Sequence, residues 1–248
     1  MIQIIPVGIS TDVRAHDELD VIILDAIGEK RIEILDGDVL VVAHKIVSKA
    51  EGHLVNLASV RPSRQALVMA RKHGKDARVM ELILKESTHV LRAQNGIIIS
   101  ETKHGLVCAN AGVDQSNVQG DVAVLLPVDP DRSARRIKDK ITKKTGKEIA
   151  VIITDTFGRP FRNGQTNVAI GVAGINPMRS YIGSRDMYGR KLRVSEIAIA
   201  DEIASAAELV MGKAEGVPTA IIRGFRFEKV KNSSARSLQR SRALDLFR

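Results

Sequence analysis

The sequence predicts a mixed α/β protein in which strands buried on both faces alternate with helices. Two continuous apolar runs, residues 39–43 and 151–153, have the composition of such strands. A succession of strand, helix and strand over residues 122–154 suggests a βαβ unit. The 248 residues suffice for one large domain or two interleaved ones. With 44% hydrophobic and 27% charged residues, the composition is typical of a globular protein with a substantial core.

The remaining elements follow from apolar periodicity between capping residues and glycines. The predicted helices cover residues 17–28, 62–74, 76–86, 133–146 and 198–212. The expected N-terminal caps of the first four are Asp17, Ser63, Asp76 and Ser133. The glycines expected to end helices are Gly28, Gly74, Gly146 and Gly212. Further strands are expected at residues 1–9, 96–100 and 219–223.

Two segments are expected to be irregular. Between Gly164 and Gly189, glycines at irregular intervals indicate loops. From Arg223 onward, Lys and Arg far outnumber Asp and Glu. Residues 225–248 are therefore expected to form a basic C-terminal tail that is partly mobile.

Charge and cysteine content limit the possible partners and the compartment. The net charge of +9 allows nucleic acid or a phosphorylated small molecule as a partner, and the helix at 133–146 carries much of it. The absence of Trp argues against stacking on single-stranded nucleic acid. Cys108 is the only cysteine, which excludes an internal disulfide and multi-cysteine zinc sites. Without a signal-peptide pattern or a membrane-spanning apolar run, the chain is expected to be cytoplasmic.

The most informative stretch is residues 151–162, an apolar strand that ends in Asp155 and Thr156. Open α/β sheets bind ligands at the carboxyl ends of their strands, and carboxylate and hydroxyl oxygens suit Mg²⁺. An Asp at the end of a strand is equally typical of a turn or a helix cap. The residues alone leave both interpretations open.

A second polar patch, residues 104–118, provides a partner for Asp155. It is dense in small residues that let the backbone approach a ligand. Asp114 and Asn117 offer carboxylate and amide groups three positions apart. Asp114 is therefore the candidate partner of Asp155 in a metal-assisted site.

Other polar side chains have more ordinary explanations. His104 and Cys108 suggest a nucleophile or metal pair, but a lone cysteine in an apolar stretch is more often packing, so we leave both out of the catalytic set. Lys45 and Lys49 could hold phosphates, although a solvated lysine face is the commoner arrangement. The chain lacks the P-loop, G-x-G-x-x-G and G-x-S-x-G motifs, so any nucleotide would be bound outside these motifs.

Six blocks of the sequence resemble the coenzyme F420-0:γ-glutamyl ligase family. They are residues 36–42, 47–52, 109–118, 129–131, 153–160 and 200–212, and the likeness extends over roughly residues 1–224. The resemblance implies an α/β fold of mixed sheets, unrelated to P-loop proteins, in a homodimer. It also implies two interwoven subdomains, about 1–95 plus 190–248, and 96–189.

The family joins L-glutamate through its amine to the terminal carboxylate of coenzyme F420-0, and can add a further γ-linked glutamate. The resemblance implies GTP as co-substrate, Mg²⁺ or Mn²⁺ as cofactor with K⁺ left open, an acyl-phosphate intermediate, and GDP and phosphate as products. It makes Asp114 and Asp155 the catalytic carboxylates, and Asp114, Asp155 and Thr156 the metal ligands. The implied GTP contacts are Val7, Gly8, Ile9, Ser10, His44, Lys45, Lys49, Asn117, Met211, Gly212, Lys213, Ala214, Glu215, Gly216, Val217 and Pro218. Arg159, Arg162 and Arg190 are candidates for substrate phosphate or carboxylates, or for surface salt bridges.

Two features depart from the family's pattern. His44 is not the residue expected beside Lys45, and the tail at residues 225–248 has no counterpart. Two other functions remain open. One is a related metal-dependent ligase with another carboxylate acceptor. The other is a basic nucleic-acid-binding protein, whose affinity would fall steeply with salt and ignore GTP. We expect neither nucleic acid nor a membrane as the partner.

Overall fold

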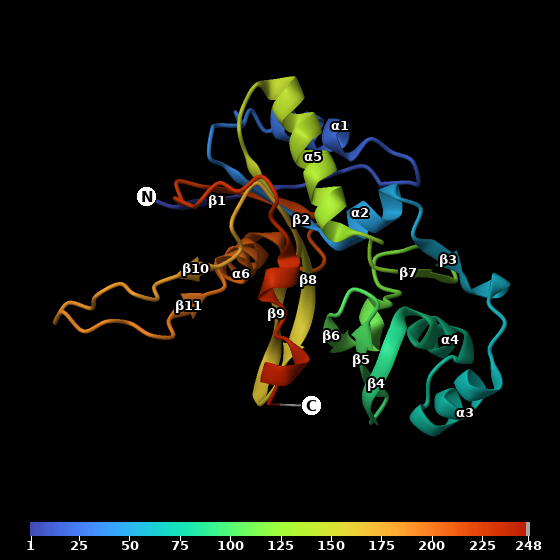
Figure 1. Cartoon of the computed structure of the whole chain (residues 1–248). Helices are drawn as coiled ribbons and strands as arrows, with labels where there is room; N and C mark the ends of the chain where they lie inside the picture. The colour runs from blue at the N-terminus through green and yellow to red at the C-terminus, as the bar shows by residue number, and fades with distance from the viewer. Residues whose placement is uncertain (247–248) are drawn as a thin grey trace.

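A computed structural model describes residues 1–246 of the chain (Figure 1). The central sheet has five strands in the order β1 (Gln3–Val7), β12 (Thr219–Arg223), β2 (Val39–Ala43), β8 (Ala150–Arg159) and β9 (Arg162–Ala173). Only the β2–β8 pair of this sheet is parallel, and its other neighbours are antiparallel. The mixed α/β fold is therefore confirmed.

The central sheet is covered on both faces, as the continuous apolar runs predict. Leu40 and Val42 of β2 belong to a core shared with α1 (Leu19–Glu29), α2 (His44–Ala50) and α5 (Pro130–Thr145). Val39 and Val41 alternate with them and pack on the opposite side against α6 (Ile199–Met211). Successive side chains of a strand point to opposite faces, so a strand with two buried faces must be apolar throughout.

A second group of elements lies beside the sheet and has its own core (Figure 1). It contains α3 (Arg64–His73), α4 (Ala77–Glu86) and a sheet of β4 (Ser87–Gln94), β5 (Ile97–Thr102) and β6 (Val107–Ala109). Two small antiparallel pairs are β3 (Leu54–Asn56) with β7 (Val122–Val124), and β10 (Arg179–Ser180) with β11 (Glu196–Ile197). Short 3₁₀ turns are η1 (Leu57–Ser59), η2 (Asn110–Gly112), η3 (Ala235–Leu238) and η4 (Arg242–Leu244). The predicted division into subdomains stays a prediction.

The predicted βαβ unit over residues 122–154 is wrong. The strand, helix and strand exist as β7, α5 and β8, but β7 pairs with β3 while β8 pairs with β2. The pattern of apolar residues shows that a segment forms a buried strand. It does not show which other strand pairs with it, because that depends on distant parts of the chain. The predicted loops after Gly164 are also wrong in part, because β9 runs through that glycine to Ala173.

Two predicted helix caps are confirmed. The Ser63 side chain accepts a hydrogen bond from the Ala66 amide at 3.2 Å, and Asp76 accepts one from the Arg78 amide at 2.7 Å. Gly74 ends its helix in the left-handed conformation, with φ of 64°. At these two helices, the side chain of the capping residue bonds to a backbone amide two or three residues away, as the sequence pattern predicts.

Two other predicted caps are wrong. Asp129 caps α5 through the Arg132 amide at 2.9 Å, while Ser133 lies inside the helix and donates to Glu51 at 2.6 Å. Asp17 accepts from the Arg14 amide instead of capping α1, and that helix runs past Gly28 to Glu29. In α5, proline at the first helical position moves the start upstream of the serine.

The C-terminal segment does not project as an arm within the described residues. Ser233 and Ala235 are buried, and the Ser234 hydroxyl donates to Asp131 at 2.5 Å. Arg242 then pairs with Glu101 at 2.8 Å. These contacts hold residues 233–242 against the body of the protein, while the partial mobility expected of the tail stays a prediction. No helix of the described chain has the length and apolar character needed to cross a membrane.

Candidate functional site

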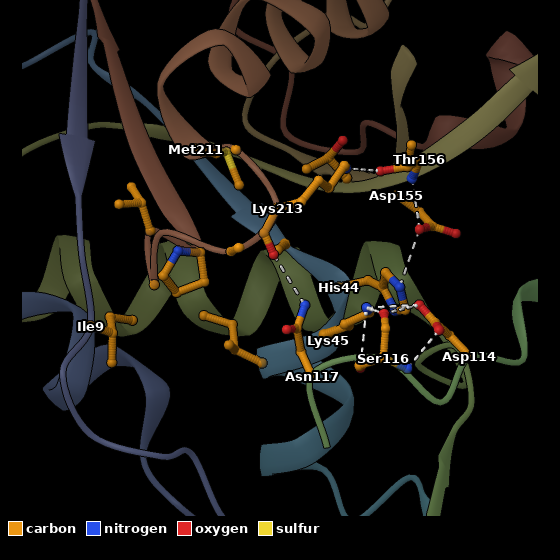
Figure 2. A pocket seen from close by; sticks show the side chains of 18 of the residues that line it. Ile9, His44, Lys45, Asp114, Ser116, Asn117, Asp155, Thr156, Met211 and Lys213 are labelled. Carbon is orange, nitrogen blue, oxygen red and sulfur yellow. Dashed lines mark hydrogen bonds and ion pairs between the residues drawn. The ribbon is translucent and has the colours of Figure 1, made fainter. Parts of the chain in front are cut away.

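A cavity of about 660 Å³ opens where the parallel pair of strands ends (Figure 2). The last residue of β2, Ala43, pairs with Thr154, and β8 then continues alongside β9 alone. Asp155 and Thr156 therefore extend beyond the carboxyl end of β2, next to the first residue of α2, His44. Ligands of open α/β sheets bind at such an edge. The predicted end of the strand at Asp155 is wrong, since β8 runs on to Arg159.

Most of the predicted site residues line this cavity. They are Ile9, His44, Lys45, Lys49, Asp114, Asn117, Asp155, Thr156, Met211, Gly212, Lys213, Ala214, Gly216, Val217 and Pro218. Four predicted GTP contacts are not part of its wall, namely Val7, Gly8, Ser10 and Glu215. The structure thus brings together Ile9 and the segment that ends at Pro218, which lie at opposite ends of the sequence. The assignment of these residues to GTP stays a prediction.

Asp155 is held as a carboxylate by its neighbours. Its Oδ1 lies 3.2 Å from His44 Nε2 and accepts a hydrogen bond from the Thr156 amide at 2.6 Å. Burial raises the pKa of Asp155, but the charge and hydrogen bond of His44 and the Thr156 amide outweigh it, so the pKa lies below its ordinary value. Asp155 is consequently ionised at neutral pH.

Asp114 lies near Asp155 in the cavity and is held in the same way (Figure 2). Lys45 Nζ lies 2.7 Å from its Oδ2, and the Ser116 amide donates to its Oδ1 at 2.8 Å. Partial burial raises the pKa of Asp114, and these two donors lower it by more. The two carboxylates are close enough for the Asp114 charge to oppose ionisation of Asp155. Two like charges held together favour a bound cation.

The donors at this point fit a hard cation. Asp114, Asp155 and Thr156 present only oxygen, the ligand type that Mg²⁺ and Mn²⁺ prefer. Within residues 1–246, no group of three or more His, Cys, Asp and Glu side chains is placed to hold a metal ion. A cation here would therefore depend on the Thr156 hydroxyl and on oxygens from a ligand, as Mg²⁺ commonly does with phosphates.

The backbone ahead of Asp114 adopts an uncommon conformation. Asn110, Ala111 and Gly112 have φ of 55°, 53° and 72° in succession. Left-handed conformations are costly for residues other than glycine, and they persist only where the surroundings enforce them. At Gly112, an added Cβ would lie 2.6 Å from the Leu126 side chain. This tight turn sets the position from which Asp114 faces the cavity.

The lysines belong to the cavity wall and not to a solvated face. Only 20% of the Lys45 side chain and 14% of the Lys49 side chain are exposed. Lys49 Nζ pairs with Asp12 at 2.7 Å, and Lys45 Nζ also donates to Ser116 Oγ at 2.5 Å. The commoner interpretation of a surface lysine face is therefore wrong at both positions.

The loop after α6 closes one side of the cavity. The Gly216 carbonyl accepts from the Ile9 amide at 3.1 Å, and the Pro218 carbonyl accepts from the Ala43 amide at 2.8 Å. Across the cavity, Asn117 Nδ2 donates to the Lys213 carbonyl at 3.3 Å (Figure 2). Hydrogen bonds to the ends of β1 and β2 thus fix residues 211–218 against the site.

Asn167 and Glu208 are among the polar residues of the wall that sequence reasoning missed. Thr156 Oγ1 donates to Asn167 Oδ1 at 2.7 Å, and Asn167 Nδ2 donates to Glu208 Oε2 at 3.0 Å. Lys213 Nζ contacts both Thr156 and Glu208. Asn167 lay in the segment predicted as loops, and Glu208 in a helix predicted only to pack. The sequence offered one signal for Glu208, namely that this charged residue directly precedes the apolar residues at the end of the helix.

The candidate arginines do not join the site. Arg159 donates to the Asn163 carbonyl at 2.6 Å in the β8–β9 turn, Arg162 is exposed on β9, and Arg190 lies on the segment between β10 and β11. None of the three lines the cavity. Their role in substrate binding stays a prediction.

His104 and Cys108 have structural explanations, as expected. Burial, together with the charge of Asp155, raises the pKa of Cys108 to about 12, so its thiol stays protonated. His104 Nε2 lies 2.8 Å from the Pro127 carbonyl and is not part of the cavity wall.

Comparison with known proteins identifies the family. The family model described as F420-0:Gamma-glutamyl ligase matches residues 8–224. A protein of Methanothermobacter thermautotrophicus named coenzyme F420:L-glutamate ligase is 48% identical over 238 residues, 95% of this chain and 94% of its own length. A protein of the same name from Methanopyrus kandleri is 45% identical over 100% of this chain and 98% of its own length. Another from Archaeoglobus fulgidus is 41% identical over 88% of this chain and 87% of its own length. The chain therefore belongs to the F420-0:γ-glutamyl ligase family.

Proposed function

We propose that this protein joins L-glutamate to coenzyme F420-0 in a GTP-dependent reaction and then adds a further γ-linked glutamate. The observation that carries the proposal is the placement of two ionised carboxylates and three lysines around one cavity. These are Asp114, Asp155, Lys45, Lys49 and Lys213. Membership of the family, and the names of its relatives, supply the substrates.

The charges of the cavity suit phosphoryl transfer, which needs positioning and neutralisation of charge more than covalent chemistry by the protein. Lys45 and Lys49 project from α2 into the cavity and would meet phosphate oxygens. Asp114, Asp155 and Thr156 would hold Mg²⁺ or Mn²⁺. When bound, this cation neutralises phosphate charge and polarises the phosphoryl oxygens.

The proposed reaction transfers the γ-phosphoryl group of GTP to the terminal carboxylate of F420-0, giving an acyl phosphate and GDP. The amine of L-glutamate then displaces phosphate from the acyl carbon. Orientation of the amine against that carbon supplies much of the rate, since a bound pair reacts as a single molecule. The walls formed by α2, β8 and residues 211–218 would hold the two reactants in this arrangement.

The test is direct. The protein, GTP, Mn²⁺, L-glutamate and F420-0 are incubated with and without K⁺, and product mass and GDP are followed. We expect GDP and F420 species carrying one or more added glutamates. The absence of both products would refute the proposal. Glutamylation of a different carboxylic acid, with F420-0 left unused, would favour the related ligase instead.

An Asp155→Asn variant tests the metal assignment within the same assay. The amide keeps the shape of the carboxylate and removes its charge, so we expect activity to fall by roughly a hundredfold or more because the charge on the phosphates is no longer balanced. Mn²⁺ binding, measured by electron paramagnetic resonance, should weaken in parallel. Full activity in a folded Asp155→Asn protein would reject this assignment.

The nucleic-acid alternative has less support from the structure than from the net charge. The cations of α5 are largely paired: Arg136 with Glu51 at 3.3 Å, and Lys140 and Lys144 with Asp20 at 3.3 and 2.6 Å. Such pairs leave less free charge for a phosphate backbone. A salt titration of DNA and RNA binding would decide the matter, because nucleic-acid affinity falls steeply with salt.

We also propose a cytoplasmic homodimer. Support comes from the apolar side chains on the segment between β10 and β11, where Met187, Tyr188 and Val194 are each more than 80% exposed. Exposed apolar clusters of this kind commonly mark protein interfaces. Light scattering should give twice the monomer mass of 27.0 kDa. A monomer mass at the protein concentration of the assay would contradict the dimer. It would not bear on the ligase activity, which the assay above tests.

A further inference from the structure

The cavity contains a carboxylate that the metal assignment leaves unused. Glu208 lies in the last turns of α6 and lines the cavity wall, with 26% of its side chain exposed. Asn167 Nδ2 donates to its Oε2 at 3.0 Å and so fixes its orientation. The Asn167 amide is in turn held by Thr156 at 2.7 Å.

An ammonium group already occupies the place in front of this carboxylate. Lys213 Nζ lies 3.2 Å from Glu208 Oε1 and 3.5 Å from Asn167 Oδ1, and it also contacts Thr156 Oγ1. Three oxygens around one nitrogen match the three donors of a primary ammonium. Nζ of Lys213 therefore marks a place that is chemically suited to the amine of another molecule.

The Glu208 pair is the easiest of the cavity's ion pairs to exchange. The Lys213 side chain is 58% exposed, whereas the partners of Asp12, Asp114 and Asp155 are 14%, 20% and 4% exposed. Exposed ion pairs contribute little free energy and form and break readily. Lys213 also belongs to the loop proposed to contact GTP, so phosphate oxygens would compete for its ammonium group.

We propose that Glu208 binds the ammonium group of the incoming L-glutamate, in the place that Lys213 Nζ occupies here, and accepts the proton that the amine must lose. This inference rests on the proposed ligase function. An ammonium nitrogen has no free electron pair and cannot attack a carbonyl. A positioned carboxylate both selects the ammonium form for binding and removes its proton.

The step balances as follows. One proton passes from the ammonium to Glu208, and the freed electron pair forms the C–N bond with the acyl carbon. The bond between that carbon and the phosphate oxygen breaks, and phosphate leaves with the electron pair. The second proton of the nitrogen goes to the departing phosphate, which leaves a neutral amide.

Binding of L-glutamate and of glutarate, which lacks the amine, tests the first half of the proposal. Calorimetry is performed on the full chain supplied with Mn²⁺ and GDP. The wild-type protein should prefer L-glutamate by roughly tenfold to a hundredfold, as expected for a charge-assisted hydrogen bond. Glu208→Gln should lose this preference, while Glu202→Gln, an exposed residue of the same helix outside the cavity, should keep it. An unchanged preference in Glu208→Gln would overturn the proposal.

Hydroxylamine tests the second half, because it is largely unprotonated at neutral pH and needs no base to attack an acyl phosphate. With GTP and F420-0, Glu208→Gln should form the hydroxamate within about threefold of the wild-type rate. Its rate of amide formation with L-glutamate should fall by about 10²- to 10⁴-fold, and Glu208→Asp should recover part of that loss. A parallel fall of both products, or unchanged amide formation, would contradict the assigned role.

The two levels of the proposal fail in different ways. If the wild-type protein makes no hydroxamate while it still glutamylates F420-0, the acyl phosphate of the proposed function is wrong. The comparison of L-glutamate with glutarate tests whether Glu208 binds the ammonium group, whether or not an acyl phosphate is formed.

Discussion

Substitution of Gly112 by alanine tests whether the turn before Asp114 is held in the conformation described above. The φ of 72° at this position costs an alanine about 1–2 kcal/mol relative to glycine. The new Cβ would also lie 2.6, 2.8 and 2.9 Å from three side-chain carbons of Leu126, which is 4% exposed and packed in the core. Forcing a methyl group into a packed core adds about 1–3 kcal/mol. We therefore expect the free energy of unfolding to fall by about 2–5 kcal/mol.

The matched control is Gly120→Ala. Gly120 has φ of 76°, but no atom lies within 4 Å of an added Cβ, so this variant incurs the backbone cost alone, about 1–2 kcal/mol. The difference between the two variants isolates the contact with Leu126. Because the chain has no Trp, urea unfolding is followed by far-ultraviolet circular dichroism.

Gly112→Ala should also lower ligase activity at temperatures where the protein is still folded, since Asp114 lies two residues away and would move with the turn. Gly120→Ala should retain activity. A Gly112→Ala protein that is no less stable than Gly120→Ala would refute the argument. The turn would then be free to relax, and its conformation could not be what positions Asp114.

Three further predictions concern stability and reactivity. Burial raises the pKa of Asp20, but the hydrogen bonds and charges of Lys144 and Lys140 together lower it by more. The charged form of Asp20 therefore stabilises the fold above the ordinary pKa of 3.8, and this contribution is lost as pH falls below that value. Asp20→Asn should therefore lower the free energy of unfolding by about 1–3 kcal/mol at pH 7, as measured by urea titration. The difference in free energy between variant and wild type should become smaller toward pH 3, and a difference that does not change with pH would contradict this. Burial raises the pKa of Cys108 to about 12, so a thiol reagent at pH 8 should label this residue slowly in the native protein and fast in urea. Rapid labelling of the native protein would contradict the burial of the thiol. Asp129→Ala should lower the free energy of unfolding, measured by thermal denaturation, by about 1 kcal/mol because α5 loses its N-terminal cap. An unchanged free energy of unfolding would show that Asp129 does not stabilise the start of this helix.

Sequence alone was sufficient where the signal is local. The buried strands β2 and β8 were readable because burial on both faces requires apolar residues throughout. The ends of α3 were readable because Ser63 and Gly74 act on neighbouring backbone groups. Likewise, Asp114 and Asp155 could be named as partners from their residue types and their blocks of sequence, before any contact between their segments was known.

Only the tertiary structure decided which segments meet. The pairing of β7 with β3, the anchoring of residues 233–242 and the position of Lys213 beside Thr156 depend on contacts between residues far apart in sequence. No local pattern encodes such contacts, because they arise from the packing of whole elements. Glu208 shows the consequence most clearly: along the chain it is one charge on a packing helix, and only the fold directs it into the cavity.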